Sequence, residues 1–219
     1  MAESARTLSL WKQQLGCVPE EVWARSDLET LILADNDLTE LPGRIGGLRA
    51  LRTLDLGHNR LSGLPEELGE LTGLCGFLYL HDNRLDALPA SLARLKKLRY
   101  LNLGENRFTA FPEAVCGMEG LIELRADGNR LPRLPESIGG LGRLRELHLR
   151  NNEIHALPPS IGGLRELRQI DLRGNPLGCL PDSLATLPHL EKLDLRWIAT
   201  LEAPAWLAAL EERGCAVYR

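Results

Sequence analysis

Leucines recur along this chain in two alternating spacings. In segments such as 51–61 (LRTLDLGHNRL), two leucines lie two residues apart, which turns them to one side of an extended strand and the residues between them to the other side. In the phrases that follow, such as 64–71 (LPEELGEL), apolar residues come three apart, the spacing of a helical or 3₁₀ turn. Each unit therefore predicts one short strand and one short helical segment, with the proline of each LP phrase at the first helical position.

These units repeat in register over nearly the whole chain. An asparagine follows each leucine-rich run, and it recurs every 23 residues with one interval of 24. The seven positions are Asn36, Asn59, Asn83, Asn106, Asn129, Asn152 and Asn175. A single unit cannot cover its own apolar face, so the units must stack on one shared core. The repeat predicts an α/β solenoid, a right-handed horseshoe with a concave parallel β-sheet and short helical or 3₁₀ segments on the convex side.

The asparagine column has a structural explanation. At the turn that leaves each strand, backbone N–H and C=O groups point inward without a strand partner. A carboxamide offers an acceptor and two donors, so we expect each asparagine to satisfy such groups in its own unit and in the next. This column is predicted to hold the fold together and to have no catalytic role.

About nine units make up a single predicted domain over residues 1–219. Residues 5–27 form an atypical N-terminal repeat, in which Gln13 takes the asparagine position. Residues 199–219 form a C-terminal cap, a short helix with Trp206, Leu207 and Leu210 inward and then an edge strand. The interval of 24 comes from one extra residue within 75–77, where Gly76 predicts a bulge at the strand entry.

The consensus LxxLxLxxNxLxxLPxxIxxLxx resembles the 23-residue repeat of Ras-group, or plant-intracellular-type, leucine-rich-repeat proteins and of similar bacterial proteins. The resemblance covers nearly the whole chain and is specific for the fold. It implies a scaffold or regulator of a signalling protein such as a GTPase, kinase or phosphatase. No residue here selects among these partners.

Composition narrows the functional classes. A net charge of −4 over 219 residues lacks the basic footprint of a nucleic-acid-binding protein. We see no signal peptide and no apolar run of about 18 residues, and the five cysteines are scattered without a C-x-x-C pair. We therefore expect a cytoplasmic, monomeric protein that binds neither nucleic acid nor membranes.

No enzyme signature occurs in the sequence, so we expect neither catalysis nor a cofactor. His58 and His81 could meet on adjacent units near Asp55 and Asp82, but these positions face solvent in this register. The segment 35–37 resembles the start of a calcium loop without its glycine and glutamate. We expect no metal site.

The outward strand positions are free of core packing and are the candidate binding surface. They include an aromatic group, two histidines and a strip of arginines: Phe77, Tyr79, Tyr100, His81, His148, Arg125, Arg150, Arg173 and Arg196. Aromatic residues and arginine are enriched in binding hot spots. For the arginine strip an equally good alternative is an internal charge lattice with Asp127, Glu146, Asp171 and Asp194.

The predicted function is a protein-interaction module or scaffold that binds a protein partner on its concave face. The alternative is the recognition portion of a larger enzyme or of a secreted bacterial effector.

Overall fold

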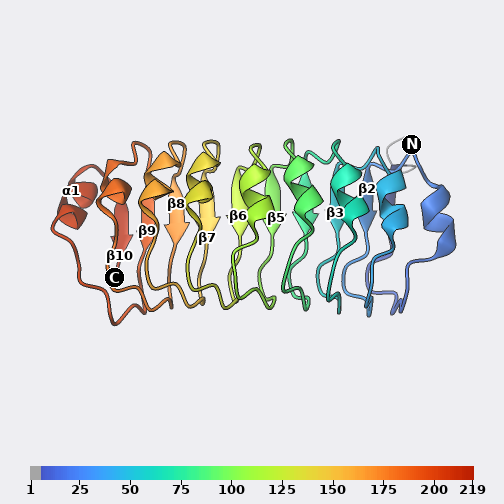
Figure 1. The fold of residues 1–219 in the computed structure, drawn as a ribbon, viewed down its shortest axis with the longest axis horizontal. Coiled ribbons are helices and arrows are strands. Elements are labelled where there is room, and N and C mark those ends of the chain that lie inside the picture. The colour runs from blue at the N-terminus through green and yellow to red at the C-terminus, as the bar shows by residue number, and fades with distance from the viewer. Residues whose placement is uncertain (1–5) are drawn as a thin grey trace.

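A computed structural model of the chain describes residues 6–219. Residue 5, where the predicted N-terminal repeat begins, lies outside this range. The expectation that the N-terminus carries no signal peptide also concerns residues 1–5, which the structure does not describe. Within it, the chain winds into successive coils, each with a strand on one side and a short helix on the other (Figure 1). No helix among the described residues has both the length and the apolarity that crossing a membrane requires.

Among residues 6–219, ten three-residue strands form one parallel sheet in sequence order. The strands are β1 (Thr7–Ser9), β2 (Thr30–Ile32), β3 (Thr53–Asp55), β4 (Phe77–Tyr79), β5 (Tyr100–Asn102), β6 (Glu123–Arg125), β7 (Glu146–His148), β8 (Gln169–Asp171), β9 (Lys192–Asp194) and β10 (Ala216–Tyr218). The central leucine or isoleucine of one strand pairs with that of the next, for example Leu78 with Leu101. This register confirms the prediction that equivalent positions of the repeat form columns across the sheet.

Eight 3₁₀ helices cover the other side of the described chain. They are η2 (Glu20–Ala24), η3 (Gly43–Gly47), η4 (Glu66–Glu70), η5 (Ala90–Arg94), η6 (Glu113–Gly117), η7 (Glu136–Gly140), η8 (Pro159–Gly163) and η9 (Asp182–Thr186). The predicted position of the repeated proline was wrong by one residue. Pro65, for example, precedes η4 in an extended conformation, and its carbonyl accepts the hydrogen bond of Leu68 N–H at 3.1 Å.

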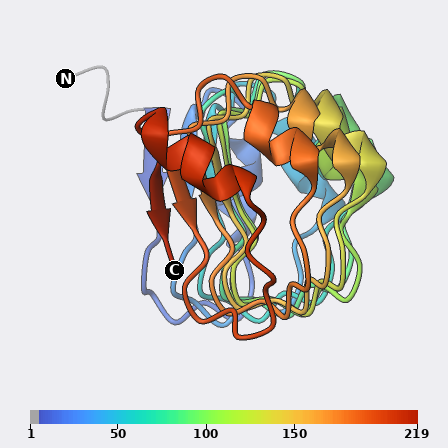
Figure 2. The ribbon, with the colours of Figure 1, turned by 90° about the vertical axis from the view of Figure 1, so that its left-hand side faces the viewer.

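The core lies between the sheet and the helices. The inward leucines of the strands and helices are almost all fully buried, as at Leu54, Leu68 and Leu101. Each such side chain contributes roughly 1.5–3 kcal/mol of burial energy. Seen along the solenoid, the strands of both ends project beyond those of the middle coils, so the sheet is hollow on its solvent side (Figure 2). We call this side the concave face.

The asparagines form a single file at the ends of the strands. Asn83 Nδ2 donates to Leu80 O at 3.2 Å in its own coil and to Leu56 O at 2.9 Å in the preceding coil. Its Oδ1 accepts from Leu61 N–H, also in the preceding coil, at 2.9 Å. The same pattern recurs at all seven ladder asparagines. The expectation that each asparagine reaches the next coil was wrong, because the file points backward along the chain.

The residue before each ladder asparagine has a left-handed backbone. Asp35, His58 and Asp82 have φ values of 56°, 51° and 51°, and glycine takes the equivalent position at Gly128 and Gly174. A non-glycine residue adopts this conformation only at some cost, and it does so here because the tight turn must aim the asparagine inward. This column of left-handed residues was not predicted from the sequence.

The predicted helix and edge strand of the C-terminal cap are both present. Helix α1 (Trp206–Glu212) buries Leu207 and Leu210, and β10 adds the last strand to the sheet. Trp206 is partly buried and packs against the core, in agreement with its predicted inward direction. Its indole nitrogen donates to Asp182 Oδ1 at 3.0 Å, so the polar edge of the ring has a partner.

The extra residue of the fourth coil is accommodated at the strand entry, as predicted. Strands β3 and β4 pair at two positions instead of three, and Thr53 has no partner at Phe77. Gly76 N–H instead donates to Arg52 O at 2.8 Å. A Cβ at Gly76 would lie 2.9 Å from that carbonyl oxygen, so the backbones approach closely only because the residue is glycine.

We predict that Gly76→Ala lowers the free energy of unfolding by roughly 1–3 kcal/mol, because backbone must move to admit the methyl group. Gly63→Ala is the matched control, since nothing lies within 4 Å of its Cβ position. Urea denaturation of both variants measures the difference. Equal effects at the two sites would contradict the close approach at Gly76.

We also predict that Asn129→Ala costs about 1–3 kcal/mol, because it leaves several buried backbone groups without partners. Gln13→Ala, at the exposed first turn, should change stability by less than about 0.5 kcal/mol. Both values come from urea melts. An unchanged free energy of unfolding for Asn129→Ala would contradict the role of the asparagine file as the main support of the turns.

Candidate functional site

The aromatic side chains of β4 and β5 point out of the concave face. Phe77 is 45% exposed, while Tyr79 and Tyr100 are partly exposed. The inward positions of these strands belong to Leu78 and Leu101, so the period of two assigns the rings to the solvent side. The sequence-based orientation of these three residues is confirmed.

These rings form one contact group, which we call the aromatic cluster: Phe77, Tyr79, His81 and Tyr100. The ring centroids of Phe77 and Tyr100 are 5.4 Å apart, and those of Tyr79 and Tyr100 are 5.0 Å apart. Tyr79 meets His81 at 6.0 Å. These distances are typical of favourable aromatic pairs, so the rings hold one another in place before any partner arrives.

His81 lies deeper than predicted. Its ring packs over Gly57 of the preceding coil, where a side chain would collide with it. Its Nδ1 is buried and has no hydrogen-bond partner in the described part of the chain. Burial, followed by the charge of His58, lowers the pKa of His81. His58 is 4.7 Å away, ring to ring, and pairs with Asp82 at 2.5 Å. A neutral His81 extends the apolar character of the cluster.

A groove of about 990 Å³ opens beside the aromatic cluster. Phe77 and Tyr100 form part of its wall, and the loops that lead into the strands form its rim. The rim carries five basic residues: Lys96, Lys97, Arg99, Arg143 and Arg145. We call this feature the basic groove. It could not be predicted from the sequence, because its loop residues come from five loops that only the stacking of coils brings together.

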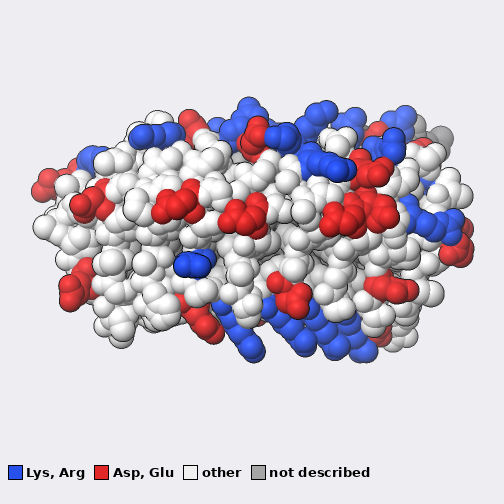
Figure 3. Space-filling view, in the orientation of Figure 1, with Lys and Arg blue, Asp and Glu red and all other residues white. Residues whose placement is uncertain are grey.

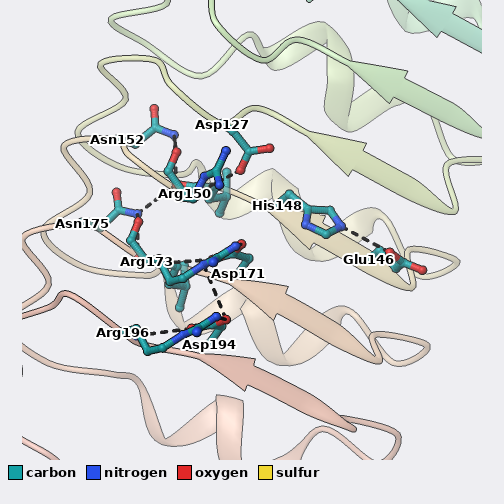
Figure 4. Close-up of polar contacts among 12 residues, drawn as sticks. Asp127, Glu146, His148, Arg150, Asn152, Asp171, Arg173, Asn175, Asp194 and Arg196 are labelled. Atoms are coloured by element: carbon teal, nitrogen blue, oxygen red, sulfur yellow. Dashed lines mark hydrogen bonds and ion pairs between the residues drawn. The ribbon is translucent and has the colours of Figure 1, made fainter. Parts of the chain in front are cut away.

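The arginine strip is mainly an internal charge lattice. Arg196 donates to both carboxylate oxygens of Asp194, at 2.9 and 2.7 Å, and Arg173 binds Asp171 in the same two-pronged way (Figure 4). Arg173 also lies 3.5 Å from Asp194. Burial alone would raise the pKa of Asp194, but the hydrogen bonds and charges of Arg196 and Arg173 lower it.

Arg125 and His148 are also paired within the chain. Arg125 Nε donates to Glu123 at 2.6 Å, and His148 Nε2 lies 3.2 Å from Glu146. Of the two interpretations of the strip, the lattice therefore describes Arg125, Arg173 and Arg196. Glu123 takes part in it in addition to the carboxylates that were expected to do so.

Arg150 differs from the other arginines of the strip. Its Nε is buried and has no hydrogen-bond partner among residues 6–219, and Asp127 accepts its backbone N–H at 2.9 Å (Figure 4). Arg150 and Asp127 line a polar hollow of about 200 Å³ that also touches Arg125, Arg173 and Lys192. We call this feature the Arg150 hollow.

Two exposed aromatic residues of the C-terminal half were not predicted as surface candidates. Trp197 is 69% exposed, and its ring lies 5.5 Å from the Arg173 guanidinium and 5.9 Å from that of Arg196. Tyr218, 44% exposed, lies 5.3 Å from the Arg196 guanidinium. Trp197 occupies the left-handed column, where other coils have small or polar residues, and that departure from the repeat was the available signal.

One group among the described residues has the composition of a metal site. Ligand atoms of Glu123, Glu146 and His148 lie within 4.8 Å of one another. Arg125 already donates to Glu123, so a cation at this point would have to displace or face a guanidinium. The arrangement favours an ion-pair network over a metal centre.

The thiols of Cys116 and Cys215 are poor nucleophiles. Burial raises the pKa of Cys116 and of Cys215, which disfavours the reactive thiolate. All five cysteines lie within the described residues and are unpaired.

Burial, the largest influence, raises the pKa of Tyr100 to about 12. We therefore predict that a tyrosinate absorbance titration contains a component with a midpoint near 12, and that Tyr100→Phe removes it. The side chain of Tyr100 ionises near pH 10 in the unfolded protein. Its contribution to the free energy of unfolding therefore falls as the pH rises from about 10 to about 12. A titration of the parent protein that is complete by pH 11 would contradict the burial of this hydroxyl.

Comparisons with known proteins agree with this architecture. The family described as leucine rich repeat matches residues 77–131 and 142–197, and a two-copy form of it matches residues 26–70. No curated protein sequence matches the chain.

Three solved structures are similar over most of the chain. A leucine-rich-repeat protein of Leptospira interrogans is 27% identical with a TM-score of 0.57, and the match covers 98% of this chain and 66% of that protein. The ectodomain of the Arabidopsis thaliana receptor kinase GASSHO1/SCHENGEN3, in complex with Casparian strip integrity factor 2, is 29% identical with a TM-score of 0.66, over 87% of this chain and 27% of the ectodomain. A TDR receptor is 29% identical with a TM-score of 0.73, over 80% of this chain and 32% of the receptor.

This chain thus spans just under two thirds of the bacterial protein and about a third or less of each receptor. Domains built from such repeats generally mediate protein–protein interaction through the extended surface that stacking creates. The repeat, the parallel sheet and the asparagine file together with these matches establish that the chain belongs to the leucine-rich-repeat family.

Proposed function

We propose that this chain is a non-enzymatic interaction module that binds a protein partner on its concave face, with the aromatic cluster as the anchor. The observation that carries the proposal is the exposure of the rings of Phe77, Tyr79 and Tyr100 on a sheet face that the core does not require them to cover. Buried aromatic anchors dominate the binding energy of many interfaces. The proposed site also includes His148 and the arginine strip, in which ion pairs within the chain hold Arg125, Arg173 and Arg196 in place for contact.

The basic groove supports a partner with acidic character. Lys97, Arg99, Arg143 and Arg145 have no ion pair among residues 6–219, whereas Lys96 is bound by Glu119. On the convex side, acidic residues begin many of the 3₁₀ helices, and the space-filling view shows them scattered across that face (Figure 3). An acidic partner is therefore attracted to the groove and repelled from the convex side.

The proposed setting is a monomeric, cytoplasmic protein in which residues 1–219 form one domain. Its resemblance to Ras-group repeats supports a role in intracellular signalling, with a GTPase, kinase or phosphatase as the class of partner. The TDR receptor and the GASSHO1/SCHENGEN3 ectodomain, the latter in complex with Casparian strip integrity factor 2, have similar repeats. That complex supports recognition of a polypeptide by this fold.

The alternative is that the same surface is the recognition portion of a larger enzyme or of a secreted bacterial effector. The greater length of the matched proteins favours this alternative. The mass of the native protein, measured on material purified from its own cells, separates the two: a mass near 24.3 kDa supports the independent module.

The site is tested with peptides selected against the parent protein from a displayed random library. We predict that Tyr79→Ala combined with Tyr100→Ala weakens the best of these peptides by about 10–100-fold, because two anchoring rings are lost. The matched control is Tyr79→Phe with Tyr100→Phe, which keeps both rings and should bind within about threefold of the parent. Fluorescence anisotropy gives the affinities, and a thermal melt checks that both variants are folded. Undiminished binding by the alanine variant would remove the aromatic cluster from the proposed site.

A further inference from the structure

The Arg150 hollow has a charge that its own side chains do not neutralise. Among its lining cations, Arg125 is paired with Glu123 and Arg173 with Asp171. Within residues 6–219, neither Arg150 nor Lys192 has a carboxylate oxygen within 4.0 Å of a side-chain nitrogen. Two uncompensated cations therefore border the hollow.

Asp127 does not serve as the missing counter-ion. One of its carboxylate oxygens accepts the backbone N–H of Arg150 at 2.9 Å, which turns the group toward the main chain. Burial raises the pKa of Asp127, although the charges of His148 and Arg150 act in the opposite direction. Apart from the ion pairs, one carboxylate thus faces two cations, of which Lys192 also lies 5.7 Å from the Tyr218 ring, and the hollow keeps an excess of positive charge.

The buried nitrogen of Arg150 adds a second, independent observation. A buried donor without a partner is costly, and the other three arginines of the strip have all found acceptors. The Arg150 side chain is placed by its turn at the edge of a preformed opening of about 200 Å³. That volume admits a carboxylate and the methylene groups that carry it, and a guanidinium binds a carboxylate through two parallel hydrogen bonds.

We propose that the Arg150 hollow receives the side-chain carboxylate of an aspartate or glutamate of the partner, with Arg150 as its main donor. The inference rests on the proposed function, because it assigns a second contact point for the polypeptide that the aromatic cluster anchors. The acidic side chain accepts hydrogen bonds from the guanidinium of Arg150 and supplies the counter-ion that residues 6–219 do not provide.

The positions of the two contact points set the spacing in the partner. Tyr79 on β4 and Arg150 after β7 are three strands apart, with two residues of offset along the strands. At about 4.8 Å per strand and about 3.3 Å per residue, the separation is on the order of 15 Å. An extended peptide spans this distance in about four residue steps, so about three residues separate the apolar anchor from the acidic one.

The probes are acetyl-Trp-Ser-Ser-Ser-Glu-amide and its Gln counterpart, each also made in the reverse order because the chain direction is open. Their blocked ends leave the glutamate as the only carboxylate. We expect the Glu peptide of one order to bind about tenfold more tightly than its Gln counterpart, the usual worth of a hydrogen bond to a charged group. In ¹⁵N spectra the Glu peptide should shift the Nε–H signal of Arg150.

Arg150→Gln should abolish the preference for Glu over Gln. Arg107→Gln is the control, because Arg107 is an exposed arginine outside the hollow. If Arg150→Gln does not fold, the comparison of the two peptides on the parent protein and the Arg150 signal still decide the question.

Equal binding of the Glu and Gln peptides in both orders, or a preference that survives Arg150→Gln, would overturn the assignment. Tighter binding of inorganic phosphate than of the Glu peptide at Arg150 would also overturn it, in favour of a phosphate site. Failure of this proposal is distinguishable from failure of the proposed function. If all four peptides bind alike and lose binding with Tyr79→Ala and Tyr100→Ala, only the Arg150 assignment is wrong.

Discussion

The inward turn after each strand is the constraint on which the rest of the structure depends. It leaves backbone donors and acceptors facing a core of leucine, and an unpaired group there costs free energy. One asparagine per coil satisfies both kinds of group at once, in its own coil and in the coil before it. Because this solution is local and repeated, any number of coils can stack without changing the interior. The shape of the molecule follows from one carboxamide used seven times in the described chain.

The fixed roles of leucine and asparagine in each coil explain which positions are available for function. Leucines fill the interior and asparagines close the turns, so the outward strand positions are released from both tasks. Selection can then vary them without unfolding the protein. The N-terminal part of this face uses rings that support one another, and the C-terminal part uses ion pairs that satisfy one another. Arg150 is the member of the arginine strip that these ion pairs do not include, and its Nε has no acceptor within the described residues.

Much of the architecture could be predicted from the sequence because a repeat states the same information many times. The strands, the inward leucines, the asparagine file and the outward direction of Tyr79 all follow from spacing. Spacing does not reveal which neighbouring coil an asparagine side chain bonds, so these side chains were expected to bond the next coil and not the preceding one. It also does not reveal rotamers, so pairing of Arg173 with Asp171 remained one of two alternatives until the side chains were placed. The basic groove depends on loops of different coils, whose neighbourhood exists only in three dimensions.

The backward reach of the asparagines gives the solenoid a polarity. Each carboxamide closes a turn that was formed earlier in the chain, as Asn106 does for Leu85. During synthesis, the N-terminal coils leave the ribosome first, and every newly emerged coil carries the group that its predecessor still lacks. Vectorial folding on the ribosome therefore proceeds by completing the preceding coil, and at any moment only the most recent turn waits for its asparagine.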